Sequence, residues 1–263
     1  LLGLKPLECC FSNVEIFPLL LSLVPTLVLM GLVGAFRFSR SLCPVLWMGI
    51  ALGVVACVPV WLMETVVEGA GDQLSGVYEK AFIQQVLGAA VSEELFIFLG
   101  FLITFFLFRH SRIKTDRDVV AIAVAAAIGF TTVENLTAVL AAESPMTTAF
   151  SRLLSIVAGH ASLQLMMGFF AAKVLLRREH RALYGFLMLA VPIVIHGWGD
   201  FSEAVFQAVD PDSQQSKQFF SCWILGIFAY IAGATVVLFK LHESTRGVTL
   251  DASDADDNSA EPS

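Results

Sequence analysis

Long apolar runs separated by short polar connections dominate the chain. Seven runs have the length of membrane spans, since about 20 apolar residues cross a bilayer as a helix. These runs occupy residues 17–36, 44–63, 81–108, 119–142, 146–176, 183–209 and 219–241. They are far too long for barrel strands, and a single segment inside lipid satisfies its own backbone only as a helix. The pattern therefore predicts an all-α membrane protein, a polytopic bundle of about seven transmembrane helices.

Lysine and arginine gather in alternate connections between these runs. The connections after the first, third and fifth runs are basic, whereas those after the second, fourth and sixth are acidic or neutral. Cytoplasmic connections carry the excess of positive charge in membrane proteins. We therefore expect the N-terminus outside and the C-terminus in the cytoplasm. A bacterial plasma membrane is the default location. Because topology explains the basic connections, no nucleic-acid partner is expected.

Composition agrees with a chain that is mostly membrane domain. Of its 263 residues, 57% are hydrophobic and 15% are charged, against about 25% charged in soluble proteins. We divide it into an outer N-terminal segment (1–16), a multi-pass membrane domain (17–241) and a tail (242–263). Acidic residues, serine and alanine dominate the tail, which predicts a disordered cytoplasmic end. Glu64 and Glu68 are expected in a solvated acidic loop.

Two adjacent carboxylates, Glu93 and Glu94, interrupt the third run. One charged side chain at bilayer depth costs about 2.5–3.5 kcal/mol, so an adjacent pair demands an explanation. One carboxylate could pair with a base while the other reaches toward the membrane surface. The alternative we favour is a polar cavity inside the helical bundle.

Other ionisable residues lie deep in later runs, and their depths agree with that cavity. With about 1.5 Å of rise per residue, the glutamate pair lies roughly 18 Å from the outer end of its helix, and the others lie roughly 12–20 Å from theirs. We predict a buried site within residues 82–206, between the third and sixth helices and open toward the outer half of the bilayer. Arg152 and Glu203 are expected to be shallower. The deep residues are Glu134, His160, His196 and Asp200.

Spacing along the helices suggests how these side chains cooperate. Asp200 lies four residues after His196, so the two share a helix face and the carboxylate can orient the imidazole. Glu93 and Glu94 are about 100° apart on their helix, so one would face the shared centre and the other would support it. Asn135 follows Glu134 and offers both a donor and an acceptor.

Three kinds of chemistry suit such a set. Glutamate and histidine ligands can hold a metal such as zinc and activate water. A glutamate can also act as a general base without metal, with histidine or asparagine stabilising an oxyanion. The H-E-x-x-H arrangement of soluble zinc proteases is absent. Buried glutamate and histidine also form proton or ion pathways, so spacing alone leaves hydrolase and transporter open.

Four motifs in order resemble those of the PrsW-type intramembrane proteases, which are related to the CAAX-prenyl endopeptidases and the bacteriocin-processing group. They cover about 91–201, and each lies in its own predicted span. The family usually has a lysine or arginine one turn after its glutamate pair, whereas this chain has Ile97 and Phe98, and Arg152 looks too shallow to replace that base. The motifs are Glu93-Glu94, the F-x-x-x-E-N run from Phe130 to Asn135, His160 with Gly168, and the H-x-x-x-D run from His196 to Asp200.

The resemblance implies an intramembrane endopeptidase that hydrolyses peptide bonds of membrane-associated protein or peptide substrates within the lipid bilayer. Glu93 would polarise the attacking water, supported by Glu94. Glu134, His160 and His196 would hold a metal ion such as zinc, or else would position the water and the oxyanion without one. Asp200 and Asn135 would orient these groups. A proton- or ion-coupled transporter and a catalytically inactive scaffold of the same fold are the alternatives.

Overall fold

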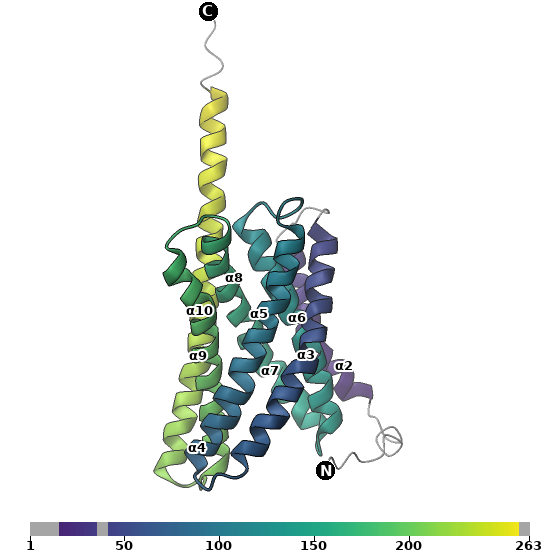
Figure 1. Ribbon diagram of the computed structural model, residues 1–263, viewed down its shortest axis with the longest axis vertical. Helices are drawn as coiled ribbons and strands as arrows, with labels where there is room; N and C mark the ends of the chain where they lie inside the picture. Colours follow the sequence, from purple (N-terminus) through teal and green to yellow (C-terminus); the bar gives the residue numbers. More distant parts are fainter. Residues whose placement is uncertain (1–15, 36–41, 258–263) are drawn as a thin grey trace, which may run out of the picture.

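The computed structural model describes residues 16–35 and 42–257, and every regular element in these ranges is helical (Figure 1). The all-α class is therefore confirmed. One element, η2, is a π-helix and joins α4 to α5 without a break. In chain order the elements are α2 (Ile16–Ala35), α3 (Cys43–Gly71), α4 (Val77–Ala81), η2 (Phe82–Ala90), α5 (Val91–Phe108), α6 (Asp116–Ala141), α7 (Pro145–Ala158), α8 (His160–Leu175), α9 (Arg181–Ala208) and α10 (Gln214–Asp257).

Five helical segments of the described chain are long and apolar enough to cross a membrane. They confirm an integral, multi-pass membrane protein and match the second, third, fourth, sixth and seventh predicted runs. The first run corresponds to α2, which is not among the five, so the count of seven stays a prediction. The five are Cys43–Gly71, Val77–Phe108, Asp116–Ala141, Arg181–Ala208 and Gln214–His242.

The fifth predicted run is wrong as a single helix. The structure breaks it at Gly159, where φ is −80° and ψ is −124°, so α7 ends and α8 begins at His160. The run is longer than one span needs, which suggests a tilt or an interfacial extension, but the apolar pattern continues across the break and does not locate it. Irregular backbone at membrane depth is tolerated where it is enclosed by protein or lines a cavity.

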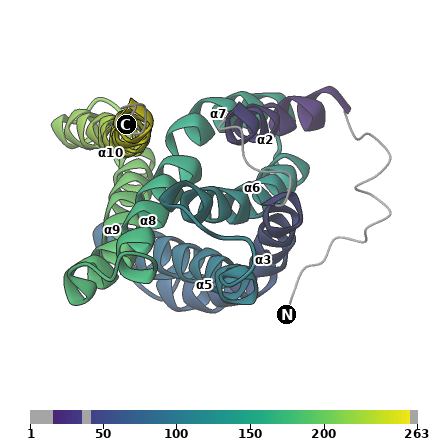
Figure 2. The same cartoon turned by 90° about the horizontal axis from the view of Figure 1, so that it is seen from above.

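The centre of the bundle is α6, which packs against α2, α3, α5, α7 and α8 (Figure 2). In the most apolar stretch of 18 residues of α6, 78% is buried inside the protein. In the corresponding stretch of α10, at the edge of the bundle, 17% is buried. Backbones of α3 and α6 touch directly. A Cβ added to Gly53 would lie 1.9 Å from the Ala126 carbonyl oxygen, and one added to Gly129 would lie 2.0 Å from that of Ile50. Small residues let membrane helices approach this closely.

The two ends of the bundle differ in charge. Connections 109–115 and 176–180 lie at the upper end in Figure 1, and 72–76, 142–144 and 209–213 lie at the lower end. The upper connections hold the basic residues and the lower ones are acidic or neutral, as predicted. Which end faces the cytoplasm stays a prediction.

The predicted terminal segments are only partly covered. Residues 1–15 lie outside the described chain. At the other end, α10 continues through part of the predicted tail as far as Asp257. The division into segments and the disorder of the tail stay predictions.

Candidate active site

A buried polar cluster lies where α5, α6, α8 and α9 meet. We call it the Glu/His cluster. Six of the seven side chains predicted for the site belong to it, although they come from residues more than 100 positions apart in the sequence. Its members are Glu93, Glu94, Glu134, His160, His196 and Asp200.

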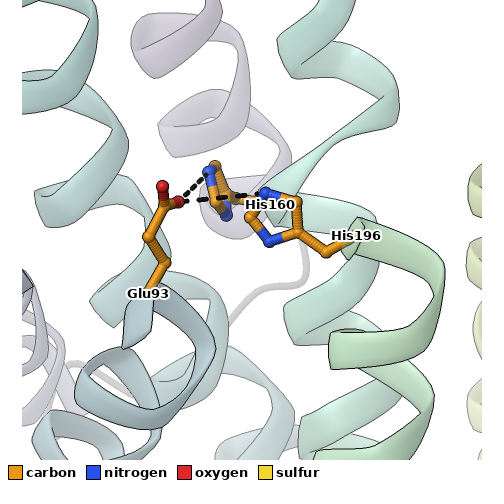
Figure 3. A group of neighbouring side chains, drawn as sticks. All are labelled: Glu93, His160 and His196. Carbon is orange, nitrogen blue, oxygen red and sulfur yellow. Dashed lines mark ion pairs between the residues drawn. The ribbon is translucent and has the colours of Figure 1, made fainter. Parts of the chain in front are cut away.

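Glu93, His160 and His196 face one another at the centre of this cluster (Figure 3). The Oε2 atom of Glu93 lies 3.2 Å from Nε2 of His160 and 3.9 Å from Nε2 of His196. The two imidazole rings meet edge to face, with centroids 4.9 Å apart. All three side chains are buried. Phe130 packs edge-on against His160, at a centroid distance of 5.4 Å, and supports that ring from α6.

These three residues could hold a metal ion. Each offers one ligand atom, and the three atoms lie within 4.8 Å of one another. Among the described residues, the buried Glu93 Oε2 has no hydrogen-bond partner, although it points at the two imidazoles. Two histidines and one glutamate are a known ligand set of catalytic zinc, which keeps a further position open for water or substrate. The residues therefore fit a zinc-like ion.

Glu94 lies on the other side of both imidazoles and is fully buried. Its Oε1 atom lies 3.0 Å from Nδ1 of His196 and 3.4 Å from Nδ1 of His160. Its Oε2 atom accepts a hydrogen bond of 2.6 Å from Nε2 of Gln164. A carboxylate behind a histidine fixes the orientation of the ring and strengthens the other ring nitrogen as a ligand. Gln164 was not predicted, although it lies one turn after His160 on α8.

A π-helix immediately precedes the two glutamates. At its end the Val91 N–H bonds to the Val86 carbonyl, five residues back. The hydroxyl of Ser92 donates to the carbonyls of Gly88 and Ala89. Such wide turns occur often at functional sites. Both glutamates reach the histidines because their side chains approach the rings from different sides, which agrees with one central and one supporting carboxylate.

Glu134 contacts the cluster from α6 and is also bound to Arg152 of α7. Its Oε2 lies 3.2 Å from Nε2 of His160, while its Oε1 is ion-paired with the Arg152 guanidinium. The group that could hold a metal contains Glu93 in the place predicted for Glu134. Arg152 was expected to be too shallow to take part, yet it reaches the cluster. That expectation counted depth along one straight helix, which the break at Gly159 invalidates.

Asp200 and Asn135 differ in how they relate to the cluster. Asp200 Oδ2 lies 3.1 Å from Nε2 of His196, as the four-residue spacing predicted. Asn135 is fully buried, but neither polar atom of its side chain has a hydrogen-bond partner within the described chain. The Thr131 hydroxyl, one turn earlier on α6, is also buried without such a partner. The orienting role of Asn135 stays a prediction.

Glu64 belongs to the surroundings of the cluster, contrary to expectation. It lies within α3, which continues to Gly71 rather than ending near residue 63. Its side chain is half-buried, in a helix that packs against η2 and α5. The expected solvated loop is therefore wrong at this position, and the second predicted span also borders the site. The sequence signal was weak, because Glu64 is the first polar residue after a long apolar run.

Comparisons with known proteins agree with the motifs. Residues 43–232 match the PrsW family intramembrane metalloproteases. A relative described as Protease PrsW, from Geobacillus kaustophilus (strain HTA426), is 29% identical over 149 residues. This match covers 57% of the present chain and 62% of the relative, less than two thirds of its length. No solved structure shows significant similarity to the chain.

Proposed function

Because the chain belongs to the PrsW family, we propose that it is an intramembrane endopeptidase that hydrolyses peptide bonds of membrane-associated proteins. The observation that carries this proposal is the buried triad of Glu93, His160 and His196, with Glu94 behind both rings. A buried ionisable cluster inside a membrane bundle is expensive and therefore marks function. Family membership favours hydrolysis over transport as that function.

We assign Glu93, His160 and His196 to holding a metal ion, with zinc the ion that this donor set suits best. When bound, such an ion supplies Lewis acidity that polarises water or a carbonyl oxygen. Glu94 holds both imidazoles so that their Nε2 atoms face Glu93. Asp200 restrains the ring of His196 from the next turn of α9.

Glu134 is the carboxylate best placed to accept a proton from the attacking water. It touches His160 but stands outside the group that could hold a metal. A general base must lie close to the bound water but must not itself be a metal ligand. The geometry thus favours exchanging the predicted roles of Glu93 and Glu134. The Arg152 guanidinium holds Glu134 in place from α7.

Exposure within the site suggests where a substrate enters. Glu94 and the two histidines have side chains at most 10% exposed, whereas Glu134 is 24% and Asp200 34% exposed. The more exposed carboxylates lie in the later turns of α6 and α9, which lead to the acidic lower end of the bundle (Figure 1). This supports entry of a peptide from that side, which we take as the outer side of a bacterial plasma membrane.

The test is metal analysis and a cleavage assay on the full chain purified in detergent. We expect about one zinc ion per chain, its loss in His196→Ala, and wild-type cleavage of a fluorogenic transmembrane peptide library. Proteoliposomes are the matched control, because a carrier would show ion flux there without cleavage. A folded wild type with neither metal nor cleavage would overturn the proposal.

A further inference from the structure

Gln164 is a fully buried polar side chain on α8, one turn after His160. Its Nε2 atom donates a hydrogen bond of 2.6 Å to Oε2 of Glu94. Its Oε1 atom is buried and has no hydrogen-bond partner among the described residues. Burying an amide with part of its hydrogen bonding unmade costs free energy, which an apolar side chain of the same size would avoid. Packing alone therefore favours an apolar residue here, and the contact with Glu94 is what a glutamine adds.

His160 and Gln164 hold the Glu94 carboxylate from the same helix. The two residues are four apart on α8 and so lie on one face of it. Nδ1 of His160 lies 3.4 Å from Oε1 of the carboxylate, while Nε2 of Gln164 bonds to Oε2. A carboxylate that is held at both oxygens cannot turn about its Cγ–Cδ bond without losing a contact. Gln164 thereby determines which oxygen of Glu94 faces the rings.

The oxygen that is fixed in this way serves both histidines. Oε1 of Glu94 also lies 3.0 Å from Nδ1 of His196 on α9. The two nitrogens of an imidazole point in different directions, so a ring whose Nδ1 faces Glu94 directs Nε2 elsewhere. Both Nε2 atoms lie on the side of Glu93, at 3.2 and 3.9 Å from its Oε2. Because Glu94 is fully buried, bulk water has no access to replace a donor that is lost.

We propose that Gln164 is a positioning residue, which acts through Glu94 to keep the Nε2 atoms of His160 and His196 directed at the position of a metal ion. The inference rests on the proposed function, because it concerns the same site. Groups that orient metal-binding histidines from behind typically contribute about 10–100-fold to metal affinity or activity. Gln164 lies one step further from the ligands than Glu94 does, so we expect an effect near the lower end of this range.

Gln164→Met keeps the length of the side chain and removes its donor. We expect its zinc affinity to be about tenfold weaker than that of the wild type, measured by competition with a chelating dye. Gln207→Met is the matched control, because Gln207 donates the same kind of hydrogen bond, to Glu203, at an exposed position. Thermal unfolding checks that each variant is folded. If Gln164→Met does not fold, Gln164→Asn replaces it, since it keeps a buried amide that is too short to reach Glu94.

A double-mutant cycle with Glu94→Gln tests whether Gln164 acts through Glu94. A residue that acts only through this carboxylate has nothing left to position once the carboxylate is replaced. In the Glu94→Gln background, Gln164→Met should therefore weaken zinc binding by less than about twofold, which is the scatter expected of independent sites. A merely structural role would instead add its full loss in that background.

The outcomes separate this inference from the proposed function. Wild-type zinc affinity in a folded Gln164→Met, with zinc still lost in His196→Ala, would reject the role of Gln164 and leave the protease proposal intact. A loss of equal size with and without Glu94, or in Gln207→Met, would reject positioning through Glu94. If the wild type cleaves but holds no zinc, the kcat values of the same cycle decide: a coupled loss supports the role, and an additive or absent loss overturns it. A wild type with neither zinc nor cleavage overturns the proposed function, and this inference with it.

Discussion

The contact between α3 and α6 and the Glu/His cluster are both buried, but different forces hold them together. In the α3–α6 contact, Gly53 and Gly129 let the two backbones touch, and any larger side chain at these positions would push the helices apart. In the cluster, six ionisable side chains from four helices, four of them buried, depend on one another for partners. Buried charged groups stabilise a fold weakly at best, whereas close helix packing stabilises it well. The contact therefore serves folding and the cluster serves chemistry.

The largest expected effect comes from filling the α3–α6 contact. Gly53→Leu would place carbon within 1.9 Å of a backbone oxygen, which the facing helix can relieve only by moving away. We expect overpacking to cost about 1–3 kcal/mol or more and to abolish folding and activity together. Yield of monodisperse protein in detergent and thermal unfolding measure this loss.

Gly69→Ala on the same helix is the control for that substitution. A Cβ at Gly69 meets nothing within 4 Å, and alanine in a helix is favoured over glycine by about 1 kcal/mol. This variant should be at least as stable as the wild type. A stable and active Gly53→Leu would show that the two helices do not depend on direct backbone contact.

In the cluster, by contrast, a substitution is expected to reduce cleavage while the protein stays folded. Glu134→Gln keeps the shape and removes the proton acceptor, so cleavage should fall by about 10²–10⁴-fold, the range typical of general acid–base catalysis. Thermal stability should fall far less than in Gly53→Leu, because the amide oxygen can still accept a hydrogen bond from Arg152, whose side chain is 34% exposed. Glu143→Gln is the control, since Glu143 is exposed just beyond the same helix. If Glu134→Gln unfolds the protein, the cluster contributes to stability and the contrast with α3–α6 fails.

Next in size is the effect of Glu94→Gln. Glu94 contacts Nδ1 of both histidines, so the amide would disturb both rings at once. We expect zinc affinity to fall by about 10–100-fold while the helices stay in place. Glu179→Gln, a substitution in a partly exposed ion pair with Lys173 outside the cluster, controls for the chemical change itself. Unchanged zinc affinity would mean that Asp200, Phe130 and the backbone orient the rings without help from Glu94.

The difference between the two regions also explains how much the sequence could predict. The membrane spans and the depth of the cluster follow from the cost of placing charge in lipid. Both can be read from the sequence of each apolar run by itself. The break at Gly159, the reach of Arg152 and the partial burial of Glu64 depend on how helices pack, which an apolar run does not encode. Whether Glu93 or Glu134 faces both imidazoles depends on how each helix is rotated about its own axis in the bundle. The order of the motifs identifies the residues of the site, but only the packing of the helices determines where each side chain lies within it.

Two ion pairs of similar chemistry sharpen the comparison further. Arg152 and Glu134 pair inside the bundle, with side chains 34% and 24% exposed. Arg152→Met should reduce kcat by about tenfold, or about 1.4 kcal/mol of lost positioning. Arg152→Lys should restore part of the rate, since it keeps the charge but loses the planar fork. If methionine and lysine behave alike, the charge of Arg152 has no part in the reaction. Steady-state cleavage of the same fluorogenic peptide gives these values.

The smallest effect is expected where the same kind of pair lies in water. Nζ of Lys80, in α4, lies 2.8 Å from Oδ1 of Asp72, in the connection after α3, and the two side chains are 45% and 64% exposed. The hydrogen bond and charge of Lys80 lower the pKa of Asp72. Any stabilisation is therefore present above the ordinary pKa of an aspartate and is lost as pH falls through the lowered value. At neutral pH Lys80→Met should leave cleavage unchanged and shift the unfolding temperature very little, because solvent screens exposed pairs. A loss of activity as large as that of Arg152→Met would show that this ion pair contributes to the active site.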